Sequence, residues 1–152
     1  MYADCWCMKD NIICHGEADT ASLGARLAGS LRHGDAVLLY GEMGAGKSVF
    51  SRGIAEALGV AGIMPSPTFL IMIPHQAANG LTIFHMDLYR LDGAEAFYAA
   101  GLDECLSEGI SLIEWPERCP GAFNKAARIV EVHISYGSNE NERVISYAHT
   151  RA

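Results

Sequence analysis

Apolar positions recur along the chain with two spacings, one typical of helices and one typical of strands. Leucines four residues apart mark an amphipathic helix for which Asp19 and Thr20 are good N-caps. The same spacing, or a run of helix formers, predicts helices over 21–32, 49–58, 94–100 and 102–106. Continuous or alternating apolar runs predict strands over 11–15, 36–40, 69–73, 81–86, 110–113, 128–137 and 143–148. Helices that alternate with strands in this way indicate an α/β protein.

Two turns indicate that some neighbouring strands are antiparallel. The loop 76–80 contains Asn79-Gly80, a dipeptide that favours hairpins, and the polar turn 138–142 separates the last two predicted strands. We expect the second hairpin at an edge of the sheet. The sheet is therefore predicted to be mixed, mostly parallel, flanked by helices and extended by antiparallel hairpins.

The predicted strand at 36–40 runs directly into GEMGAGKS at 41–48, which fits the phosphate-binding P-loop pattern G-x-x-x-x-G-K-[ST]. Glycines let the backbone curl around phosphate oxygens, Lys47 reaches the β- and γ-phosphates, and the Ser48 hydroxyl is a ligand for Mg²⁺. We therefore expect a nucleotide to contact Glu42, Met43, Gly44, Ala45, Gly46, Lys47, Ser48 and Val49. The chain 1–152 is predicted to be a single P-loop NTPase-like domain, with 1–10 as a loose N-terminal arm.

Acidic residues stand at the ends of two predicted strands downstream of the P-loop, namely Asp87 and Glu114. The carboxyl ends of parallel strands deliver functional groups to the ligand in such folds, so both are candidates for Mg²⁺ contacts and catalysis. Glu114 could instead polarise the attacking water, and Asp87 could simply cap a turn. His85, close to Asp87, is either catalytic or structural.

Two further positions carry candidate chemistry. Thr68 lies in an extended, proline-bounded loop one helix downstream of the P-loop, where many P-loop enzymes carry a switch residue that meets Mg²⁺ and the γ-phosphate. The alternative is an ordinary rigid turn. Trp115 is expected near the bound base or at an interface, with core packing as the alternative.

Composition limits the classes of partner and compartment. The 152-residue chain has a net charge of −7, which argues against unaided binding to nucleic acid. Neither a signal peptide nor a membrane span is visible, so we expect a cytoplasmic protein. The five cysteines are odd in number and favour thiols over disulfides. Cys5, Cys7, Cys14 and His15 are irregularly spaced for a zinc site, and small apolar side chains near a strand are the simpler interpretation.

Taken in order, four motifs resemble the TsaE family, formerly YjeE, of small bacterial P-loop ATPases in tRNA threonylcarbamoyladenosine biosynthesis. The motifs are GEMGAGKS at 41–48, SPTF at 66–69, HMDLYRL at 85–91 and IEWPE at 113–117. The resemblance covers roughly 15–135. It implies ATP hydrolysis with Mg²⁺ in support of the TsaB–TsaD pair, in which TsaD transfers a threonylcarbamoyl group to N6 of adenosine 37 in tRNAs that read ANN codons. The tRNA would be met indirectly, through that complex.

The same resemblance assigns a role to individual side chains. It implies catalytic roles for Lys47, Thr68, Asp87 and Glu114, metal contacts for Ser48, Asp87 and Glu114, and a nucleotide contact for Trp115. Ser48 stands where the family usually has threonine, and both residues supply the hydroxyl. The cysteine-rich arm and the tail after Gly137 lie outside the family pattern.

Other functions remain open from the residues alone. A GTPase would need an Asn-Lys-x-Asp base reader, and Asn124-Lys125-Ala-Ala lacks its carboxylate, so adenine is favoured. A small-molecule kinase would need a lid over the phosphoryl acceptor, and no Arg-rich lid is visible in the sequence. A nucleotide-gated binding module is the third possibility. Slow hydrolysis that a partner complex accelerates would favour such a gate over a free-standing enzyme.

Overall fold

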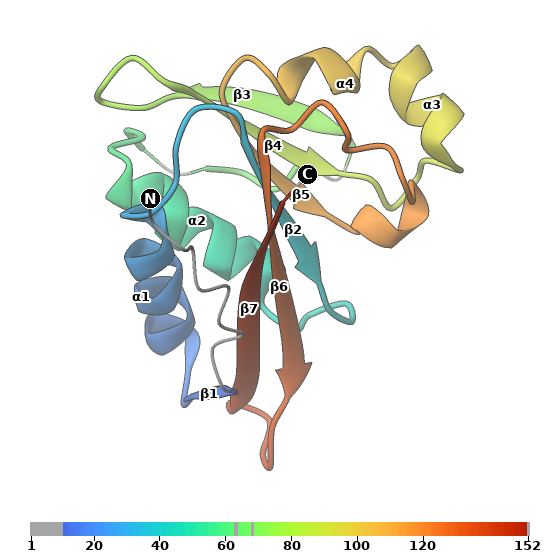
Figure 1. Ribbon diagram of the computed structural model, residues 1–152. Coiled ribbons are helices and arrows are strands. Elements are labelled where there is room, and N and C mark those ends of the chain that lie inside the picture. The colour runs from blue at the N-terminus through green and yellow to red at the C-terminus, as the bar shows by residue number, and fades with distance from the viewer. Residues whose placement is uncertain (1–10, 63, 68, 152) are drawn as a thin grey trace.

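Seven strands pair into one sheet in the computed structural model, which describes residues 11–62, 64–67 and 69–151 (Figure 1). From edge to edge the strands are β1 (Ile12–Cys14), β7 (Arg143–Arg151), β6 (Arg128–Tyr136), β2 (Asp35–Tyr40), β5 (Ile110–Glu114), β4 (Thr82–Asp87) and β3 (Met72–Gln76). The four central strands β6, β2, β5 and β4 are parallel, and β3, β7 and β1 add antiparallel pairs on both sides. The predicted mixed α/β sheet is therefore confirmed.

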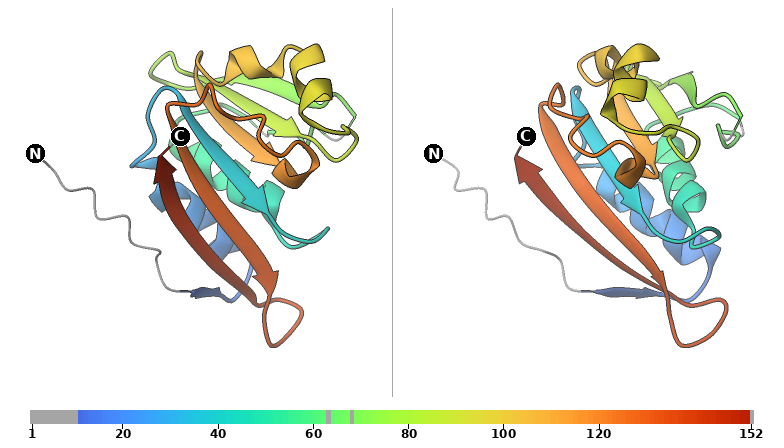
Figure 2. Two further views of the ribbon diagram at one scale, coloured as in Figure 1. Left: turned by 45° about the vertical axis from the view of Figure 1, so that its right-hand side comes forward. Right: turned by 90° about the vertical axis from the view of Figure 1, so that its right-hand side faces the viewer.

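Helices cover both faces of this sheet. Helices α1 (Glu17–Ala28) and α2 (Lys47–Ala57) lie side by side on one face, and α3 (Ala94–Ala99), α4 (Leu102–Cys105) and the short 3₁₀ helix η1 (Pro116–Arg118) lie on the other (Figures 1 and 2). Two hydrophobic clusters result, one under α1 and α2 and one under α3, α4 and the chain after β5. Buried on both faces, the parallel strands carry nearly continuous apolar runs.

The first helix begins and ends about four residues earlier than predicted, so the assignment of Asp19 and Thr20 as N-caps is wrong. Gly16 is the N-cap, and Asp19 lies inside the first turn, where its Oδ2 accepts a hydrogen bond from the backbone N–H of His15 at 2.9 Å. The leucine spacing identified the buried face correctly, with Leu23 and Leu27 in the core. It did not locate the helix ends, because capping is decided by the few residues at each end.

The strand predicted over 69–73 is also displaced and runs over Met72–Gln76 as β3. A tight turn precedes it, in which the carbonyl of Pro67 accepts hydrogen bonds from the N–H groups of Leu70 and Ile71 at 3.2 and 2.8 Å. Ile71 has a φ of +65°, an unusual value for a β-branched residue. Because β3 is an edge strand, Pro74 is tolerated within it.

The predicted hairpin of the last two strands is present, but neither of its strands is the edge strand of the sheet, because β1 takes that place. β6 pairs parallel to β2, and β7 pairs antiparallel to β6, while β1 covers β7 over three residues. The remaining predicted elements lie at the expected places, among them the break between α3 and α4 at Gly101, whose φ is +73°. The proposed arm 1–10, with Cys5 and Cys7, lies outside the described residues.

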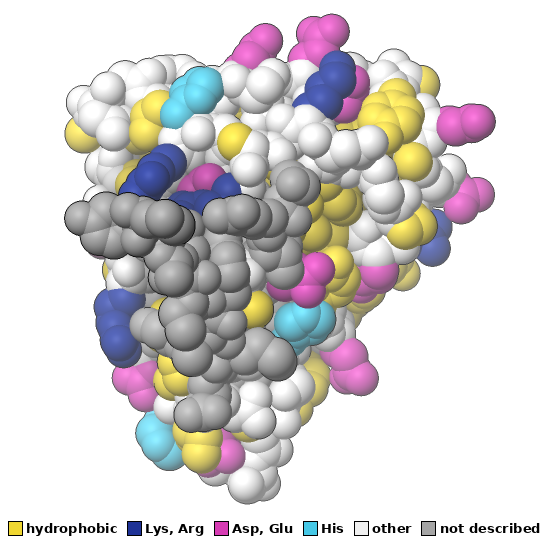
Figure 3. Space-filling model, viewed as in Figure 1, with side chains coloured by type: hydrophobic (Ala, Val, Ile, Leu, Met, Phe, Trp, Pro, Cys, Tyr) yellow, Lys and Arg dark blue, Asp and Glu magenta, His cyan; other side chains and the backbone are white. Residues whose placement is uncertain are grey.

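The surface and the length of the helices complete the description. The face drawn in Figure 3 carries acidic side chains on several elements around its outline, in keeping with the net charge of −7. Within the described ranges, none of the helices is both long and apolar enough to cross a membrane. The described cysteines, Cys14, Cys105 and Cys119, are buried free thiols.

Candidate functional site

The loop 41–46 joins the carboxyl end of β2 to the first residue of α2, as the P-loop motif predicts. Gly44 and Gly46 have φ values of +78° and +113°, which L-residues rarely adopt. Gly41 lies so close to β6 that an added Cβ would stand 2.7 Å from the Ile134 carbonyl oxygen. The glycines are therefore required by the path of the backbone, which leads the N-terminus of α2 toward the loop interior.

Lys47 projects from the first turn of α2 into a buried position, with 5% of its surface exposed. Its Nζ donates to the carbonyl oxygens of Gly41 and Glu42, the second at 3.4 Å, and lies 3.7 Å from the centroid of the Trp115 ring. Burial lowers the pKa of the ammonium group, and nearby carboxylates, Glu114 foremost, oppose that change. The cation is thus held by a π face and by carbonyl dipoles.

Ser48, Glu114 and His85 form a hydrogen-bonded chain between α2, β5 and β4. Ser48 Oγ donates to Glu114 Oε1 and Oε2, at 3.0 and 3.2 Å, and His85 Nε2 lies 2.6 Å from Glu114 Oε2. The carboxylate oxygen accepts this hydrogen bond in the tautomer that carries the proton on His85 Nε2. His85 is fully buried and Glu114 is 4% exposed. Because β5 is the neighbour of β2, Glu114 is the strand-end acid that contacts the P-loop serine.

Asp87 ends β4 next to Glu114, with which it is in register across the parallel pair. Its carboxylate is 7% exposed, and its Oδ1 accepts a hydrogen bond from the Tyr89 N–H at 3.0 Å. Burial raises the pKa of Asp87, the Tyr89 hydrogen bond opposes the rise, and the charge of Glu114 adds to it. The two acids therefore share one poorly solvated region.

Trp115 follows β5 with a φ of +58°, an outlier for so bulky a residue. Its ring meets the Tyr89 ring edge to face, with centroids 5.0 Å apart, and also lies against the Lys47 ammonium group described above. The half-buried side chain packs against the hydrophobic cluster under α3 and α4 as well, so the core-packing alternative applies alongside the pocket contact. Strained backbone of this kind persists where the surroundings hold it in place, and it is often found at ligand sites.

A pocket of about 480 Å³ gathers most of the predicted site residues. Those that line it are Met43, Gly44, Ala45, Gly46, Lys47, Ser48, Val49, Asp87, Glu114 and Trp115. Glu42 does not line it and contributes through its carbonyl oxygen. Thr68 lies outside the described residues, although Ser66 of the same loop lines the pocket. Within the described part of the chain, no three His, Cys, Asp or Glu side chains cluster as a metal site.

Sequence patterns do not mark every residue in or beside the pocket. Catalytic and structural roles are both open for His85 from the sequence. His85 does not line the pocket but contacts Glu114, which does, and strand alternation places it on the same face as Asp87. Tyr89 was not singled out. At the other end of the pocket lie Gly16, Glu17 and Thr20 from α1 with Asn141 and Arg143 from the β6–β7 hairpin. No local pattern marks these five residues as neighbours of the P-loop.

Comparison with known proteins agrees with the motifs and the fold. The sequence model of the family "Threonylcarbamoyl adenosine biosynthesis protein TsaE" matches residues 14–145. The tRNA threonylcarbamoyladenosine biosynthesis protein TsaE of Streptomyces coelicolor is 45% identical over 97 residues, which span 62% of this chain and 66% of that protein. The protein of the same name from Rickettsia felis is 37% identical over 136 residues, 89% of this chain and 77% of that one.

A solved structure shows the same architecture. The crystal structure of YdiB from Bacillus subtilis superposes with a TM-score of 0.70 and 26% sequence identity, covering 91% of this chain and 84% of that one. The motifs, the P-loop fold and the matched length together leave one assignment. The chain belongs to the TsaE family of tRNA threonylcarbamoyladenosine biosynthesis proteins.

Proposed function

We propose that this protein is a Mg²⁺-dependent ATPase that supports the TsaB–TsaD pair in forming N6-threonylcarbamoyladenosine at position 37 of tRNAs that read ANN codons. The observation that carries the proposal is the convergence of Lys47, Ser48, Glu114 and Asp87 on one pocket of about 480 Å³, a size common for small-molecule sites. Residues that lie far apart in the sequence meet there with the chemistry that phosphoryl transfer requires.

In this proposal Lys47 exchanges its carbonyl partners for the β- and γ-phosphate oxygens of ATP. The exchange is favourable because phosphate is a charged acceptor, whereas the carbonyls of Gly41 and Glu42 are neutral. The P-loop N–H groups and the N-terminus of α2 bind the same oxygens. Trp115 restricts where the ammonium group can move, because its ring lies against Nζ.

The donor set at the end of β5 fits Mg²⁺. Ser48 and Glu114 present hard oxygen ligands 3.0 Å apart, and Asp87 ends the neighbouring strand. Mg²⁺ usually takes one or two protein oxygens and completes its shell with phosphate and water, so a site of three protein ligands is not required. The ion would neutralise charge on the phosphates. His85 holds the Glu114 carboxylate in place by its hydrogen bond, and Glu114 and Asp87 are the candidates to orient the attacking water.

Two observations support adenine and a protein partner. Lys125 of the only Asn-Lys dipeptide is paired with Asp103 Oδ2 at 2.7 Å on the surface and does not line the pocket, so a guanine reader of that type is not built. Large apolar side chains are exposed at the P-loop and in the loop before β3, with Met43, Phe69 and Leu70 at 69%, 79% and 71% exposure. Exposed apolar groups of this size favour a protein interface.

The test is ATP hydrolysis by the purified protein, alone and with TsaB, TsaD and tRNA. We expect slow turnover that rises when the partners are added. The Lys47→Ala variant should lose ATP binding or turnover in both conditions, because the P-loop cation is gone. Unchanged affinity and hydrolysis in that variant would refute the P-loop assignment. A preference for GTP, or a rate that ignores the partners, would refute the tRNA role and leave the P-loop.

A further inference from the structure

The P-loop is held from outside by the β6–β7 hairpin. Tyr136, the last residue of β6, donates its hydroxyl to the carbonyl oxygen of Met43 at 2.8 Å. Arg143, the first residue of β7, donates Nε to the carbonyl oxygen of Ala45 at 2.9 Å and Nη2 to that of Gly44 at 3.4 Å. Three consecutive carbonyls of the loop therefore have hydrogen-bond donors on the hairpin.

The Arg143 side chain is also held in place by contacts within the hairpin. Its Nη1 donates to the carbonyl oxygens of Glu140 and Glu142, at 2.6 and 3.0 Å. Its guanidinium carbon lies 4.5 Å from the centroid of the Tyr136 ring. A planar cation with five donors suits such a position, because it can serve several carbonyls and still stack on a ring. The two hairpin residues therefore form one unit.

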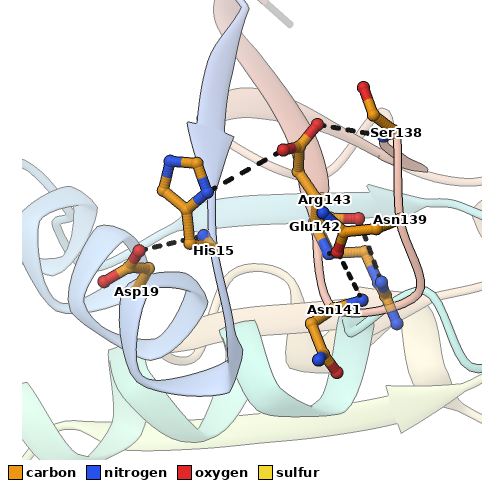
Figure 4. Close-up of polar contacts among 7 residues, drawn as sticks. All are labelled: His15, Asp19, Ser138, Asn139, Asn141, Glu142 and Arg143. Carbon is orange, nitrogen blue, oxygen red and sulfur yellow. Dashed lines mark hydrogen bonds and ion pairs between the residues drawn. The ribbon is translucent and has the colours of Figure 1, made fainter.

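The turn that carries Arg143 is closed by its own hydrogen bonds (Figure 4). Asn139 Oδ1 accepts from the N–H groups of Asn141 and Glu142, at 3.0 and 3.1 Å. Glu142 Oε1 accepts from the Ser138 N–H at 2.9 Å, and its other oxygen lies 3.8 Å from His15 Nδ1. The hairpin end is thus a defined structure that is also connected to the segment between β1 and α1.

The contacts fix the direction of the loop's peptide groups. In a trans peptide the C=O of one residue and the N–H of the next point to opposite sides. Bonding the carbonyls of Met43 and Ala45 to the hairpin turns the N–H groups of Gly44 and Gly46 away from it. Contact is close enough that a Cβ on Gly44 would lie 3.0 Å from the Tyr136 hydroxyl oxygen.

We propose that Arg143, assisted by Tyr136, is a positioning residue that sets the P-loop peptide groups for phosphate binding. It acts through loop carbonyls and not through its own charge on the ligand. The proposal rests on the proposed nucleotide-binding function of the loop. It also gives a role to Arg143, which lies after the last of the four sequence motifs but inside the 14–145 range that the family model matches.

The experiment measures binding of ATP and of inorganic tripolyphosphate by calorimetry, with Mg²⁺, to purified variants whose melting temperatures are recorded. Tripolyphosphate needs the loop but has no nucleoside. Arg143→Ala, Arg143→Lys and Tyr136→Phe are compared with Arg26→Met, a matched loss of one guanidinium from α1. Guanidinium ion is then added to Arg143→Ala to test for rescue.

We expect Arg143→Ala to lower the affinity for both ligands by the same factor, about 10- to 100-fold, because two charge-assisted hydrogen bonds are lost. Arg143→Lys should lose nearly as much, because one ammonium group cannot serve the same set of carbonyls. Tyr136→Phe should also lower the affinity for both ligands equally, but by a smaller factor. Guanidinium should restore part of the affinity of Arg143→Ala, and Arg26→Met should bind as the unmodified chain does.

Three results would overturn the inference. A loss confined to ATP would mean that Arg143 contacts the nucleoside. A loss that Lys restores, with Tyr136→Phe unaffected, would mean that Arg143 acts by its own charge. Unchanged affinity in all hairpin variants would mean that the contact is structural. If Arg143→Ala does not fold, Tyr136→Phe and Arg143→Lys decide the question. An unmodified chain that binds neither ligand refutes the proposed function first, and so separates the two failures.

Discussion

Charged side chains are buried near both ends of strand β2, but their hydrogen-bond partners differ between the two ends. At the amino end, Asp35 is 2% exposed and its two oxygens accept hydrogen bonds from Arg128, at 3.1 and 2.6 Å, and from the Arg32 N–H at 2.7 Å. At the carboxyl end, Lys47 is 5% exposed and is bonded to neutral carbonyls, while Asp87 and its neighbouring acid line the same pocket.

The difference separates a structural pair from a site. Asp35 and Arg128 satisfy each other, so the amino end needs no ligand to complete it. At the carboxyl end, burial lowers the pKa of Lys47 and raises the pKa of Asp87, so each group is held in surroundings that disfavour its charge. Ionisable side chains that line a pocket and whose pKa is perturbed in this way are typical of functional sites. Mutations at the two ends should therefore affect different properties.

The largest effect is expected for Glu114→Gln, which keeps an oxygen for the Ser48 and His85 donors and removes the charge. Hydrolysis should fall by about 10²–10³-fold, as when one electrostatic group of an active site is lost. ATP affinity should change by less than about tenfold, because the P-loop contacts remain. Stopped-flow hydrolysis and calorimetry measure the two quantities. Glu108→Gln, the same change at an exposed carboxylate outside the pocket, is the control, and equal losses of rate and affinity would indicate a binding or folding role instead.

Asp35→Ala should give the next largest effect, and on stability alone. It leaves the Arg128 guanidinium, whose side chain is 23% exposed, without its carboxylate. Because water reaches part of that group, we expect a loss of about 2–3 kcal/mol in the free energy of unfolding, less than for a fully buried pair. Urea unfolding measures the loss. ATP affinity of the folded variant should be unchanged, and a large fall in affinity would mean that the two ends of β2 are coupled.

Gly34→Ala and Gly44→Ala compare the two ends with the same chemical change. Gly34 has a φ of +92° and would place a Cβ 3.0 Å from that of Ala127, while Gly44 has +78° and would place it 3.0 Å from the Tyr136 hydroxyl. Each variant should lose about 1–2 kcal/mol of stability from left-handed backbone strain. Only Gly44→Ala should also lose ATP affinity, because it alone displaces the P-loop. Similar affinities in both variants would remove the functional distinction between the ends.

The sequence predicted the fold well because apolar spacing reports which faces are buried. The helix after the P-loop and the parallel strands carry that spacing over their whole length, and all are present. The errors fall where a few local hydrogen bonds decide the outcome. Asp19 lies inside the first turn of α1, although it was expected to precede the helix. A turn closed by the Pro67 carbonyl places the start of β3 at Met72, later than predicted. Spacing carries little information about such ends.

The residues that line the candidate site could be predicted where a motif or a strand end marked them. Lys47 and Ser48 follow from the P-loop pattern, and Asp87 and Glu114 from the rule that parallel strands present ligands at their carboxyl ends. Arg143 was missed because its partner in the loop lies 98 positions earlier in the sequence, and strand register alone brings them together. A contact of that range leaves no local pattern to read.

Asp87→Asn is expected to give the smallest effect. It measures most directly the free-energy cost of burying a charge near the carboxyl end of β2. The variant keeps the Oδ1 that accepts the Tyr89 N–H and removes the buried charge. The pKa of Asp87 is raised in the folded state above its ordinary value of 3.8. Between these two pKa values the folded protein keeps the Asp87 proton, whereas the unfolded chain has released it. Stability of the unmodified chain should therefore fall as pH rises from that value through the raised pKa, and remain lower above it.

The Asn variant lacks this titration, so it should be more stable than the unmodified chain at neutral pH. Its advantage should shrink as pH falls through the raised pKa toward 3.8, because protonated Asp87 and Asn are then equally uncharged. Urea unfolding of both proteins across this range measures the difference, with Asp92→Asn as a control for loss of an exposed carboxylate. A variant less stable at neutral pH would mean that Asp87 is stabilised by its charge, and the carboxyl end of β2 would then resemble the amino end.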